Sequence, residues 1–342
     1  MLSIPVPFVV SLLFGLIAIT LYIRYDEQAK SSCVFLGLCA ITTAVVGLRW
    51  AYQLPFLHYL QPVLASMIPV IAWITFSNSA PSKRLYLHWI GPFVITLFVL
   101  CHLFWPAPID LLLTAIYLFY GINLIRHSTQ QSLMFNVALG SWDHVKKAEN
   151  IAGWMLIFSA VIDAAMSADF AFNQGIWATY ILAIGHAVLL PVLSFAVIVM
   201  GISTPIDEET KHLMSSYDEI SPLKEESSLS EQDAREIIAK LDQNMHDKQS
   251  YLDPDLTLAK LSKKIGVPAK QISIAVNQIH QRNISKLINE YRIKHAKNAL
   301  TSSSDTITKV FLSSGFQTKS NFNREFLRVT GTTPSQYRKQ AR

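Results

Sequence analysis

The stretch from Ser313 to Lys339, SSGFQTKSNFNREFLRVTGTTPSQYRK, decides how the C-terminal third of the chain folds. Within it, Phe322, Phe326 and Val329 recur at i, i+4 and i+7. This spacing predicts a helix over residues 319–329 whose apolar stripe packs inward. The opposite face carries cations and small polar side chains suited to phosphates and base edges. These are Lys319, Ser320, Asn323, Arg324 and Arg328.

Turn residues bound this helix on both sides. Gly315 precedes it, at the end of another short helix that begins near Thr306, as expected for a glycine that ends a helix. After it, Thr333 can cap a terminal helix in which Pro334 takes the first position. The pattern is therefore helix, turn, helix and terminal helix, and the last of these carries Arg338.

A first helix-turn-helix pattern precedes this one. Leu256, Leu258 and Leu261 supply the apolar positions of its first helix. Gly266 marks the turn, and Pro268 opens the second helix, which is expected to enter the major groove of DNA. The outward face of that second helix carries the predicted DNA contacts Lys270, Gln271, Ser273, Ile274 and Asn277.

A helix over residues 284–300 is predicted to connect the two units, because apolar residues recur through it at helical spacing. At a rise of 1.5 Å per residue it forms a rod of about 25 Å. Such a rod can hold two recognition helices about 34 Å apart, which is one turn of duplex DNA. One chain would then read two adjacent major grooves.

The C-terminal part of the sequence resembles the AraC/XylS family of transcription regulators. The resemblance covers residues 233–342, about a third of the chain. It includes Tyr291-Arg292-Ile293 in the connecting helix. In the second unit it rests on Gly315-Phe316, Asn321-Phe322, Arg324-Glu325-Phe326, Gly331, Thr333-Pro334-Ser335 and Tyr337-Arg338.

The resemblance implies a domain that binds double-stranded DNA through two recognition helices. Base reading by the second unit is expected at the start of its recognition helix, and phosphate contacts at cations further along. Ile274 departs from the family, where polar or basic readers are frequent, although it could contact a thymine methyl. The resemblance also implies a homodimer or paired sites, and RNA polymerase is a further candidate partner. The base readers are Lys319, Ser320, Asn321 and Arg324, and the phosphate contacts are Arg328 and Arg338.

Composition indicates two unlike parts. The 342 residues are 51% hydrophobic and only 15% charged, which is more apolar than ordinary soluble domains. Residues 1–202 hold eight Lys/Arg and seven Asp/Glu, residues 203–231 two and eight, and residues 232–342 nineteen and nine. The first part fits a lipid bilayer and the basic last part fits DNA. The acidic residues between them predict a flexible linker.

Residues 1–202 contain seven apolar stretches that can cross a bilayer as helices of about 20 residues, some with flanking residues included. The first lacks the positive region and cleavage site of a signal peptide and is expected to remain as a mature span. The predicted fold class is all-α, with a seven-helix transmembrane bundle followed by a double helix-turn-helix domain. The stretches are about 6–23, 33–48, 60–76, 85–105, 109–125, 151–170 and 176–202.

Loop cations orient the predicted bundle. With the N-terminus outside, seven Lys/Arg fall in inner loops and only Arg49 falls in an outer loop. The positive-inside rule then predicts a multi-pass protein of the bacterial inner membrane with a periplasmic N-terminus and a cytoplasmic C-terminal domain. In the long inner loop, residues 133–147 predict either an interfacial helix or a loop followed by an early start of the sixth span.

Ionisable side chains inside the predicted spans are costly in lipid, so they mark candidate sensing residues. Asp163 and His186 lie at mid-bilayer depth on the sixth and seventh spans, and Arg49, His102 and Asp169 lie near the outer ends. One interpretation is an outward-facing polar cavity for an unknown small molecule or membrane signal. A hydrogen bond that holds the helices together, such as Asp163 to His186, is another, and a proton relay is a third.

The sequence has no Walker loop, no dinucleotide fingerprint and no metal-ligand cluster. Cys33, Cys39 and Cys101 lie in apolar segments without the spacing of a disulfide framework or a metal site. The chain is therefore predicted to be a sequence-specific transcription regulator, not an enzyme and without a cofactor, that couples a membrane signal to promoter binding. The alternatives are a transporter or membrane enzyme carrying a fused DNA-binding module, and a membrane part that only anchors.

Overall fold

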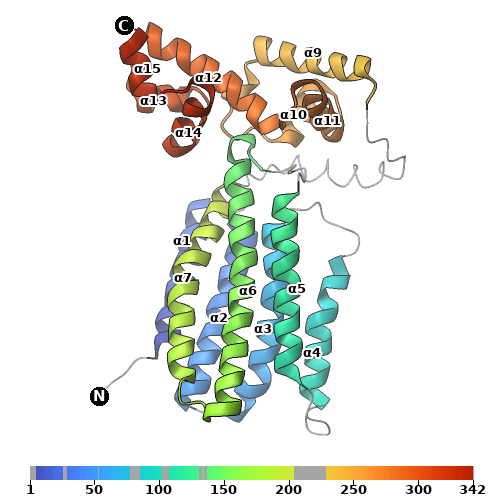
Figure 1. Ribbon diagram of the computed structural model, residues 1–342, viewed down its shortest axis with the longest axis vertical. Coiled ribbons are helices and arrows are strands. Elements are labelled where there is room, and N and C mark those ends of the chain that lie inside the picture. The colour runs from blue at the N-terminus through green and yellow to red at the C-terminus, as the bar shows by residue number, and fades with distance from the viewer. Residues whose placement is uncertain are drawn as a thin grey trace. The chain divides into compact units, whose positions relative to one another are not determined.

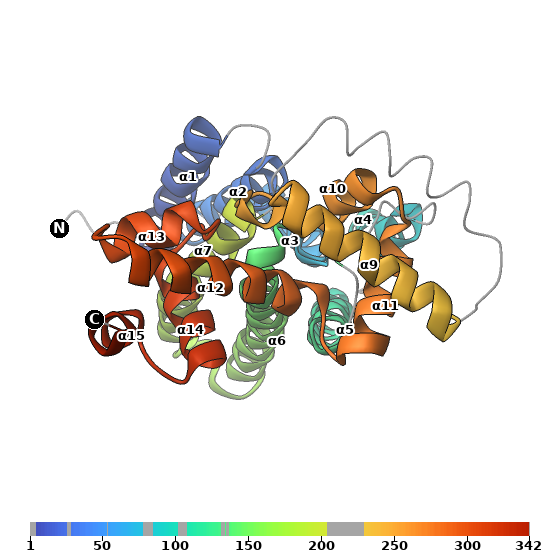
Figure 2. The same cartoon turned by 90° about the horizontal axis from the view of Figure 1, so that it is seen from above.

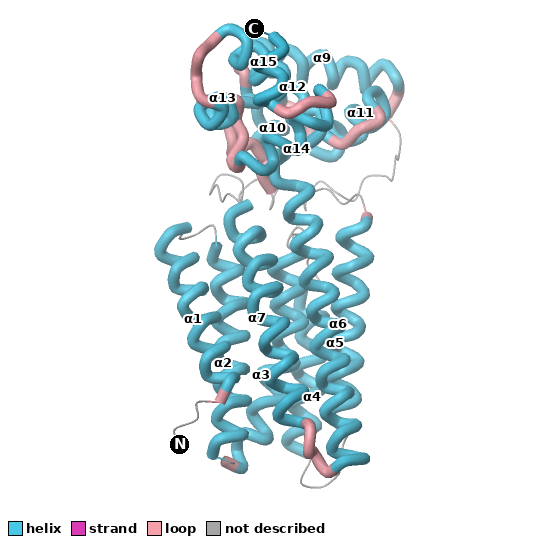
Figure 3. The backbone as a smooth tube through the Cα atoms, turned by 60° about the vertical axis from the view of Figure 1, so that its left-hand side comes forward, coloured by secondary structure: helices cyan, strands magenta, loops and turns pink. Residues whose placement is uncertain are grey.

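The computed structural model describes residues 5–25, 29–52, 54–77, 85–101, 108–130, 134, 137–203 and 229–341. The regular elements in those ranges are all helices (Figure 3), and an isolated antiparallel bridge joins Ala138 to Thr257. The all-α fold class is confirmed for these residues. The chain divides into two compact units, of which the first comprises Met1–Ser132 and His144–Thr204 and the second Leu133–Asp143 and Pro205–Arg342.

The first unit is a bundle of helices that run side by side (Figure 1). Six helices in the described residues are long and apolar enough to cross a membrane, and a shorter apolar helix covers Tyr86–Cys101. The predicted fourth span continued into residues that are not described, so the count of seven spans stays a prediction. The helices are α1 (Val6–Tyr25), α2 (Lys30–Tyr52), α3 (Pro55–Phe76), η2 (Leu85–Trp89), α4 (Ile90–Cys101), α5 (Ile109–Thr129), α6 (Trp142–Asn173) and α7 (Ala178–Ser203).

Glycines let α5 and α6 approach each other closely. A Cβ added to Gly121 would lie 2.9 Å from the carbonyl oxygen of Gly153, and a Cβ on Gly153 would lie 2.9 Å from the carbonyl oxygen of Gly121. Small residues are the usual means by which membrane helices gain close van der Waals contact. Further along the same two helices, His127 Nδ1 lies 2.5 Å from Oε1 of the fully buried Glu149. The pair of helices is thus joined by backbone contact and by a buried polar pair.

The second unit is arranged along α12. In Figures 1 and 2, α9, α10 and α11 gather near one end of this helix, and α13, α14 and α15 near the other. The predicted connecting helix is therefore present, with a helix-turn-helix pair at each end. The elements are η3 (Leu139–Ser141), α9 (Glu231–Asp247), η4 (Ser250–Leu252), α10 (Leu258–Ile265), α11 (Ala269–His280), α12 (Ile284–Ser302), α13 (Ile307–Ser313), α14 (Lys319–Thr330) and α15 (Pro334–Ala341).

The apolar stripe of α14 forms the core of the second helix-turn-helix pair. Phe322 and Phe326 are fully buried. The ring of Phe322 lies 5.3 Å from that of Phe316, and the ring of Phe326 lies 5.5 Å from that of Tyr337. Val329 is 39% exposed, so its predicted inward packing is wrong. It lies in the last turn of α14, and the buried part of the stripe ends before the helix does.

The described part of residues 133–147 forms no separate interfacial helix. The short turn η3 leads directly into α6 at Trp142, so the helix predicted over 151–170 starts early. The segment Leu133–Asp143 belongs to the second unit, although it lies between α5 and α6 in sequence. This differs from the predicted division at residues 1–202, 203–231 and 232–342. Most of the predicted acidic linker, residues 204–228, lies outside the described residues.

Candidate nucleic-acid interface and sensing cavity

In the first helix-turn-helix pair the turn falls at Gly266 as predicted, whereas α10 begins at Leu258, so Leu256 lies before the helix and not in it. Thr257 caps α10 by accepting a hydrogen bond from the Lys260 backbone N–H at 3.1 Å. Gly266 ends α10 with φ +68°, a left-handed conformation that favours glycine. In α11, the predicted DNA contacts Lys270, Gln271 and Asn277 are exposed, whereas Ser273 and Ile274 are half-buried. The exposed face of α11 thus includes the polar side chains of Lys270, Gln271 and Asn277.

The second pair is positioned in the same way. Thr318 Oγ1 caps α14 by accepting a hydrogen bond from the Asn321 backbone N–H at 3.3 Å. Gly315 has φ +80°, and a Cβ there would lie 2.6 Å from the carbonyl oxygen of Tyr251. Both its conformation and its close contact therefore require glycine. These constraints fix where the first turn of α14 begins and which side chains it presents.

The four predicted base readers at the start of α14 divide into two pairs. Lys319 and Ser320 are exposed, whereas Asn321 is only 4% exposed. Asn321 Nδ2 donates to the carbonyl oxygen of Gly140 at 2.6 Å, and Arg324 Nη2 donates to Asn321 Oδ1 at 2.8 Å. Arg324 Nη2 also lies 3.3 Å from Asp143 Oδ2. Asn321 and Arg324 are therefore held by hydrogen bonds and an ion pair to residues that lie just before and at the start of α6 in sequence.

The two predicted phosphate contacts are in different surroundings. Arg328 forms an ion pair with Glu325 at 2.9 Å and with Glu290 at 3.1 Å, which joins α14 to α12. Although partial burial opposes it, the attraction of Glu325 raises the pKa of Arg328. Arg338 is half-buried, and its Nε and Nη2 have no hydrogen-bond partner within the described residues. Arg328 is thus used in packing, while Arg338 keeps donors unsatisfied.

Arg292 on α12 is a buried cation that touches both helix-turn-helix pairs. Its side chain is 1% exposed. Nε donates to the carbonyl oxygen of Tyr251 at 2.7 Å, and Nη2 donates to that of Asp253 at 2.8 Å. The guanidinium also lies 5.7 Å from the ring centroid of Phe316, a cation–π contact. Burial lowers the pKa of Arg292 to about 10, against the attraction of Asp253 and Asp255, so it stays charged at neutral pH.

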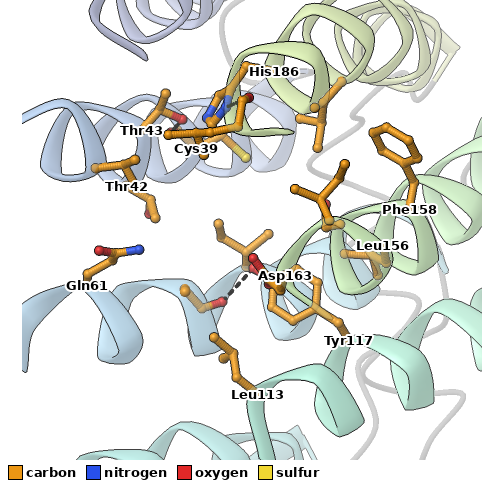
Figure 4. Close-up of a pocket in the computed structure, with 18 of the residues that line it drawn as sticks. Cys39, Thr42, Thr43, Gln61, Leu113, Tyr117, Leu156, Phe158, Asp163 and His186 are labelled. Carbon is orange, nitrogen blue, oxygen red and sulfur yellow. Dashed lines mark hydrogen bonds between the residues drawn. The ribbon is translucent and has the colours of Figure 1, made fainter. Parts of the chain in front are cut away.

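The first unit contains a cavity of about 310 Å³ between its helices. Arg49, Asp163 and His186, three of the predicted sensing residues, all line it. Figure 4 shows Gln61, Tyr117, Asp163 and His186 around this space, on different helices. A second cavity of about 680 Å³ shares Arg49 and Asp110 with the first. Side chains far apart in sequence are thus brought to a common space inside the bundle.

Polar groups in the cavity are only partly paired with one another. Arg49 Nη1 donates to Gln61 Oε1 at 2.7 Å. Tyr117 Oη donates to the carbonyl oxygen of Ala65 at 3.0 Å. His186 Nδ1 lies 2.8 Å from the carbonyl oxygen of Leu182 in its own helix, and no hydrogen bond between His186 and Asp163 occurs among the described residues. The hydrogen bond suggested above between these two side chains is therefore not formed.

The other two predicted sensing residues do not join this group. Asp169 is 5% exposed and does not line either cavity, and its Oδ2 accepts a hydrogen bond from the Trp177 backbone N–H at 2.9 Å. It therefore supports the turn between α6 and α7. His102 lies outside the described residues.

Sequence reasoning missed Gly140, Asp143 and Arg292 as parts of the interface. Arg292 could have been noticed as a lone cation within the apolar positions of the connecting helix. Gly140 and Asp143 carry no such signal, because only the fold brings residues 181 positions apart in sequence into contact.

Comparison with known proteins agrees with this geometry. Residues 261–340 match a family model described as a helix-turn-helix domain. That part of the chain is therefore a helix-turn-helix domain. More narrowly, it is a helix-turn-helix domain of the AraC type, which confirms the resemblance drawn from the sequence.

Similar proteins come from one bacterial species. Uncharacterized HTH-type transcriptional regulators of Staphylococcus aureus strains MSSA476 and N315 are each 34% identical over 88 residues. Another from Staphylococcus aureus is 33% identical over 88 residues. The match covers 26% of this chain and 12% of each relative, so the chain spans only a small share of the length of these relatives. No solved structure shows significant similarity.

Replacing Arg292 with methionine is expected to destabilise the second unit. Arg292→Met removes a buried guanidinium and leaves the carbonyl oxygens of Tyr251 and Asp253 without their donor, which costs about 3 kcal/mol of unfolding free energy. Hydrogen exchange of α12 in the full-length protein, followed across a urea series, measures this loss. The control is Arg282→Met, because Arg282 is an exposed partner of Glu290 and its loss costs less than about 1 kcal/mol. Equal losses of unfolding free energy in Arg292→Met and Arg282→Met would show that the hydrogen bonds of Arg292 do not stabilise the second unit more than an exposed ion pair does.

Proposed function

We propose that this chain is a multi-pass regulator of the bacterial inner membrane that binds promoter DNA through residues 229–341. The observation that carries the proposal is the AraC-type helix-turn-helix domain at residues 261–340, present in one chain with six apolar helices long enough to cross a membrane. A helix-turn-helix pair near each end of α12 supports contact with two adjacent major grooves of DNA. The chain regulates transcription and does not act as an enzyme.

Within this domain we assign base reading to the start of α14 and phosphate contact to α15. The N-terminal residues of a recognition helix lie nearest the base edges. Lys319 and Ser320 are already exposed there, and Arg324 lies one turn further on with a half-buried guanidinium. Arg338 on α15 is half-buried, with Nε and Nη2 buried and without a partner among the described residues, so its assignment to a phosphate rests on its place in the terminal helix and on the family resemblance.

Arg324→Ala and Arg338→Ala should impair DNA binding in different ways. Loss of a base reader costs about 1–3 kcal/mol of binding free energy and relaxes the sequence preference at one base pair. Loss of a phosphate contact weakens binding to all DNA sequences alike, and it lowers the slope of log affinity against log salt concentration by about one. The measurement is the affinity of the full-length protein in detergent for its footprinted promoter site and for scrambled DNA, across a salt series. If Arg324→Ala weakens both DNAs equally, α14 is not the base reader and α11 carries the specificity.

The proposed topology has a periplasmic N-terminus and a cytoplasmic DNA-binding domain. It is supported by the seven cations in the inner loops against Arg49 alone in the outer ones. A reporter enzyme active only in the periplasm should be silent when fused after Ile202 and active when fused between Phe172 and Gly175. A membrane-independent control fusion to the second unit alone should be silent. The reverse pattern for the two fusions would exclude this topology.

We further propose that the cavity in the first unit binds the signal. Its walls are largely apolar but include Arg49, Asp163 and His186, which is the usual make-up of a small-molecule site. This composition favours a small, mainly apolar ligand that carries at least one hydrogen-bonding or charged group. Ionisable side chains at this depth are expensive in lipid and are retained mostly for function.

Asp163→Asn and His186→Gln should fix the output of the regulator at one level. Each removes an ionisable group from the cavity while keeping the side chain nearly the same size. The measurement is promoter activity in cells across growth conditions under which the wild-type output changes, together with the amount of protein in the membrane fraction. The matched control is Asp169→Asn, because Asp169 does not line the cavity, and it should respond like wild type. Normal responses in both cavity variants would contradict sensing through this site.

A further inference from the structure

Residues 137–143 connect α5 to α6 in sequence, but they pack inside the second unit. We refer to them as the docked segment. Its backbone pairs with the first helix-turn-helix pair, since Ala138 and Thr257 form an antiparallel bridge and the Leu139 N–H donates to the Leu256 carbonyl oxygen at 2.8 Å. The Leu139 carbonyl oxygen accepts a hydrogen bond from Ser285 Oγ on α12. The segment is therefore held by main-chain bonds that do not depend on its own side chains.

Apolar side chains anchor the docked segment. Val137, Ala138 and Leu139 are fully buried, and Trp142 is 4% exposed. Trp142 Nε1 donates to the Val137 carbonyl oxygen at 3.2 Å, so the segment folds back on itself. Burial of this much apolar surface is more than a surface loop normally provides.

Gly140 lies in close contact with α12, so a larger residue there would displace the Arg292 guanidinium. A Cβ added to Gly140 would lie 2.6 Å from Nη1 of Arg292, the buried cation that contacts both helix-turn-helix pairs. The next residue, Ser141, donates from Oγ to Gln317 Oε1 at 3.0 Å, and Gln317 Nε2 donates to Asp255 Oδ1 at 2.8 Å. The segment thus contacts the loops before both α10 and α14.

The docked segment also occupies two of the predicted base readers. Both functional groups of the Asn321 amide are used, one by the Gly140 carbonyl oxygen and the other by Arg324. The carboxylate of Asp143 pairs with Arg324. A side chain that is 4% exposed, with its amide nitrogen and oxygen both hydrogen-bonded, is withheld from a base edge, and a carboxylate beside the reader repels phosphates.

From these contacts we infer that the docked segment is an intrachain ligand of the DNA-binding unit that competes with DNA for the start of α14. The inference rests on the proposed function, because it requires α14 to read DNA. With the segment docked, Asn321 and Arg324 are withheld from the major groove. When the segment leaves, both side chains are released together. Because the segment is covalently continuous with α5 and α6, a rearrangement of these helices is a direct way to withdraw it.

Docking itself is testable without DNA. In full-length protein with Cys33, Cys39 and Cys101 replaced by alanine, Ser141→Cys should react with a maleimide at least about 10-fold more slowly than Ser335→Cys, because Ser141 is buried and Ser335 is exposed. Adding the footprinted promoter DNA should speed the reaction at residue 141 and leave residue 335 unchanged. Fast labelling at residue 141 without DNA would overturn the inference.

Competition is tested by tethering. In the same background, S141C and Q317C are joined by a thiol-cleavable bis-maleimide, which fixes the segment in place. The tethered protein should bind the promoter site about 10-fold more weakly than after cleavage, the factor expected when the competent form is reduced to about one-tenth. Because the two forms are the same molecules before and after cleavage, a folding defect cannot produce the difference. Equal or tighter binding by the tethered form would overturn the inference.

A single substitution in the docked segment tests the competition independently of the tether. Asp143→Asn removes the partner of Arg324 and should raise affinity for the promoter site by about 3-fold or more. The matched control is Asp247→Asn, an exposed residue at the end of α9 that changes the net charge equally, and it should alter affinity by less than about 2-fold. If tethering and Asp143→Asn change nothing while Arg324→Ala still abolishes specific binding, only the docking inference fails. If no form binds DNA specifically, the proposed function fails and the competition fails with it.

Discussion

The guanidinium of Arg292 is the buried group on which the arrangement of the second unit depends. A cation that is 1% exposed is tolerated only if its donors are satisfied, and here backbone carbonyl oxygens of Tyr251 and Asp253 accept from it. Those residues belong to the first helix-turn-helix pair, whereas Phe316, which lies beside the guanidinium, belongs to the second. One side chain on α12 therefore fixes the orientation of both pairs, and with it the relation between the two recognition helices.

The same guanidinium explains why a segment from between two apolar helices fits into this unit. Its Nη1 lies where a Cβ on residue 140 would approach it to 2.6 Å, so glycine fits beside the guanidinium without displacing it. The preceding residue, Leu139, is held in place because its N–H donates to the Leu256 carbonyl oxygen and its carbonyl oxygen accepts from Ser285 Oγ. The DNA-binding unit is thus built from two separate parts of the chain, and its most polar contacts fall at the start of α14.

In the first unit, different physical chemistry applies. Close contact between Gly121 and Gly153 and the buried pair His127–Glu149 join α5 to α6, and such contacts would also hold the two helices together in lipid, which gives no hydrophobic drive for helices to associate. The cavity that contains Asp163 lies in the same bundle, with Leu156 of α6 and Tyr117 of α5 among its lining residues. A ligand in this cavity would therefore touch the two helices that the docked segment connects in sequence.

The sequence by itself determined the helices, their caps and the AraC-type character of the C-terminal unit. These depend on local spacing and on single residues such as Gly266 and Gly315, whose positive φ is a feature of the local backbone. It also gave the apolar helices, because the length of an apolar run is a local property. The tertiary structure decided which polar side chains share the cavity, that Asp169 supports a turn, and that Val329 faces outward. It alone decided that Gly140 and Asp143 meet Asn321 and Arg324, because contacts between residues so distant in sequence depend on how the whole chain packs and leave no periodic trace in the sequence.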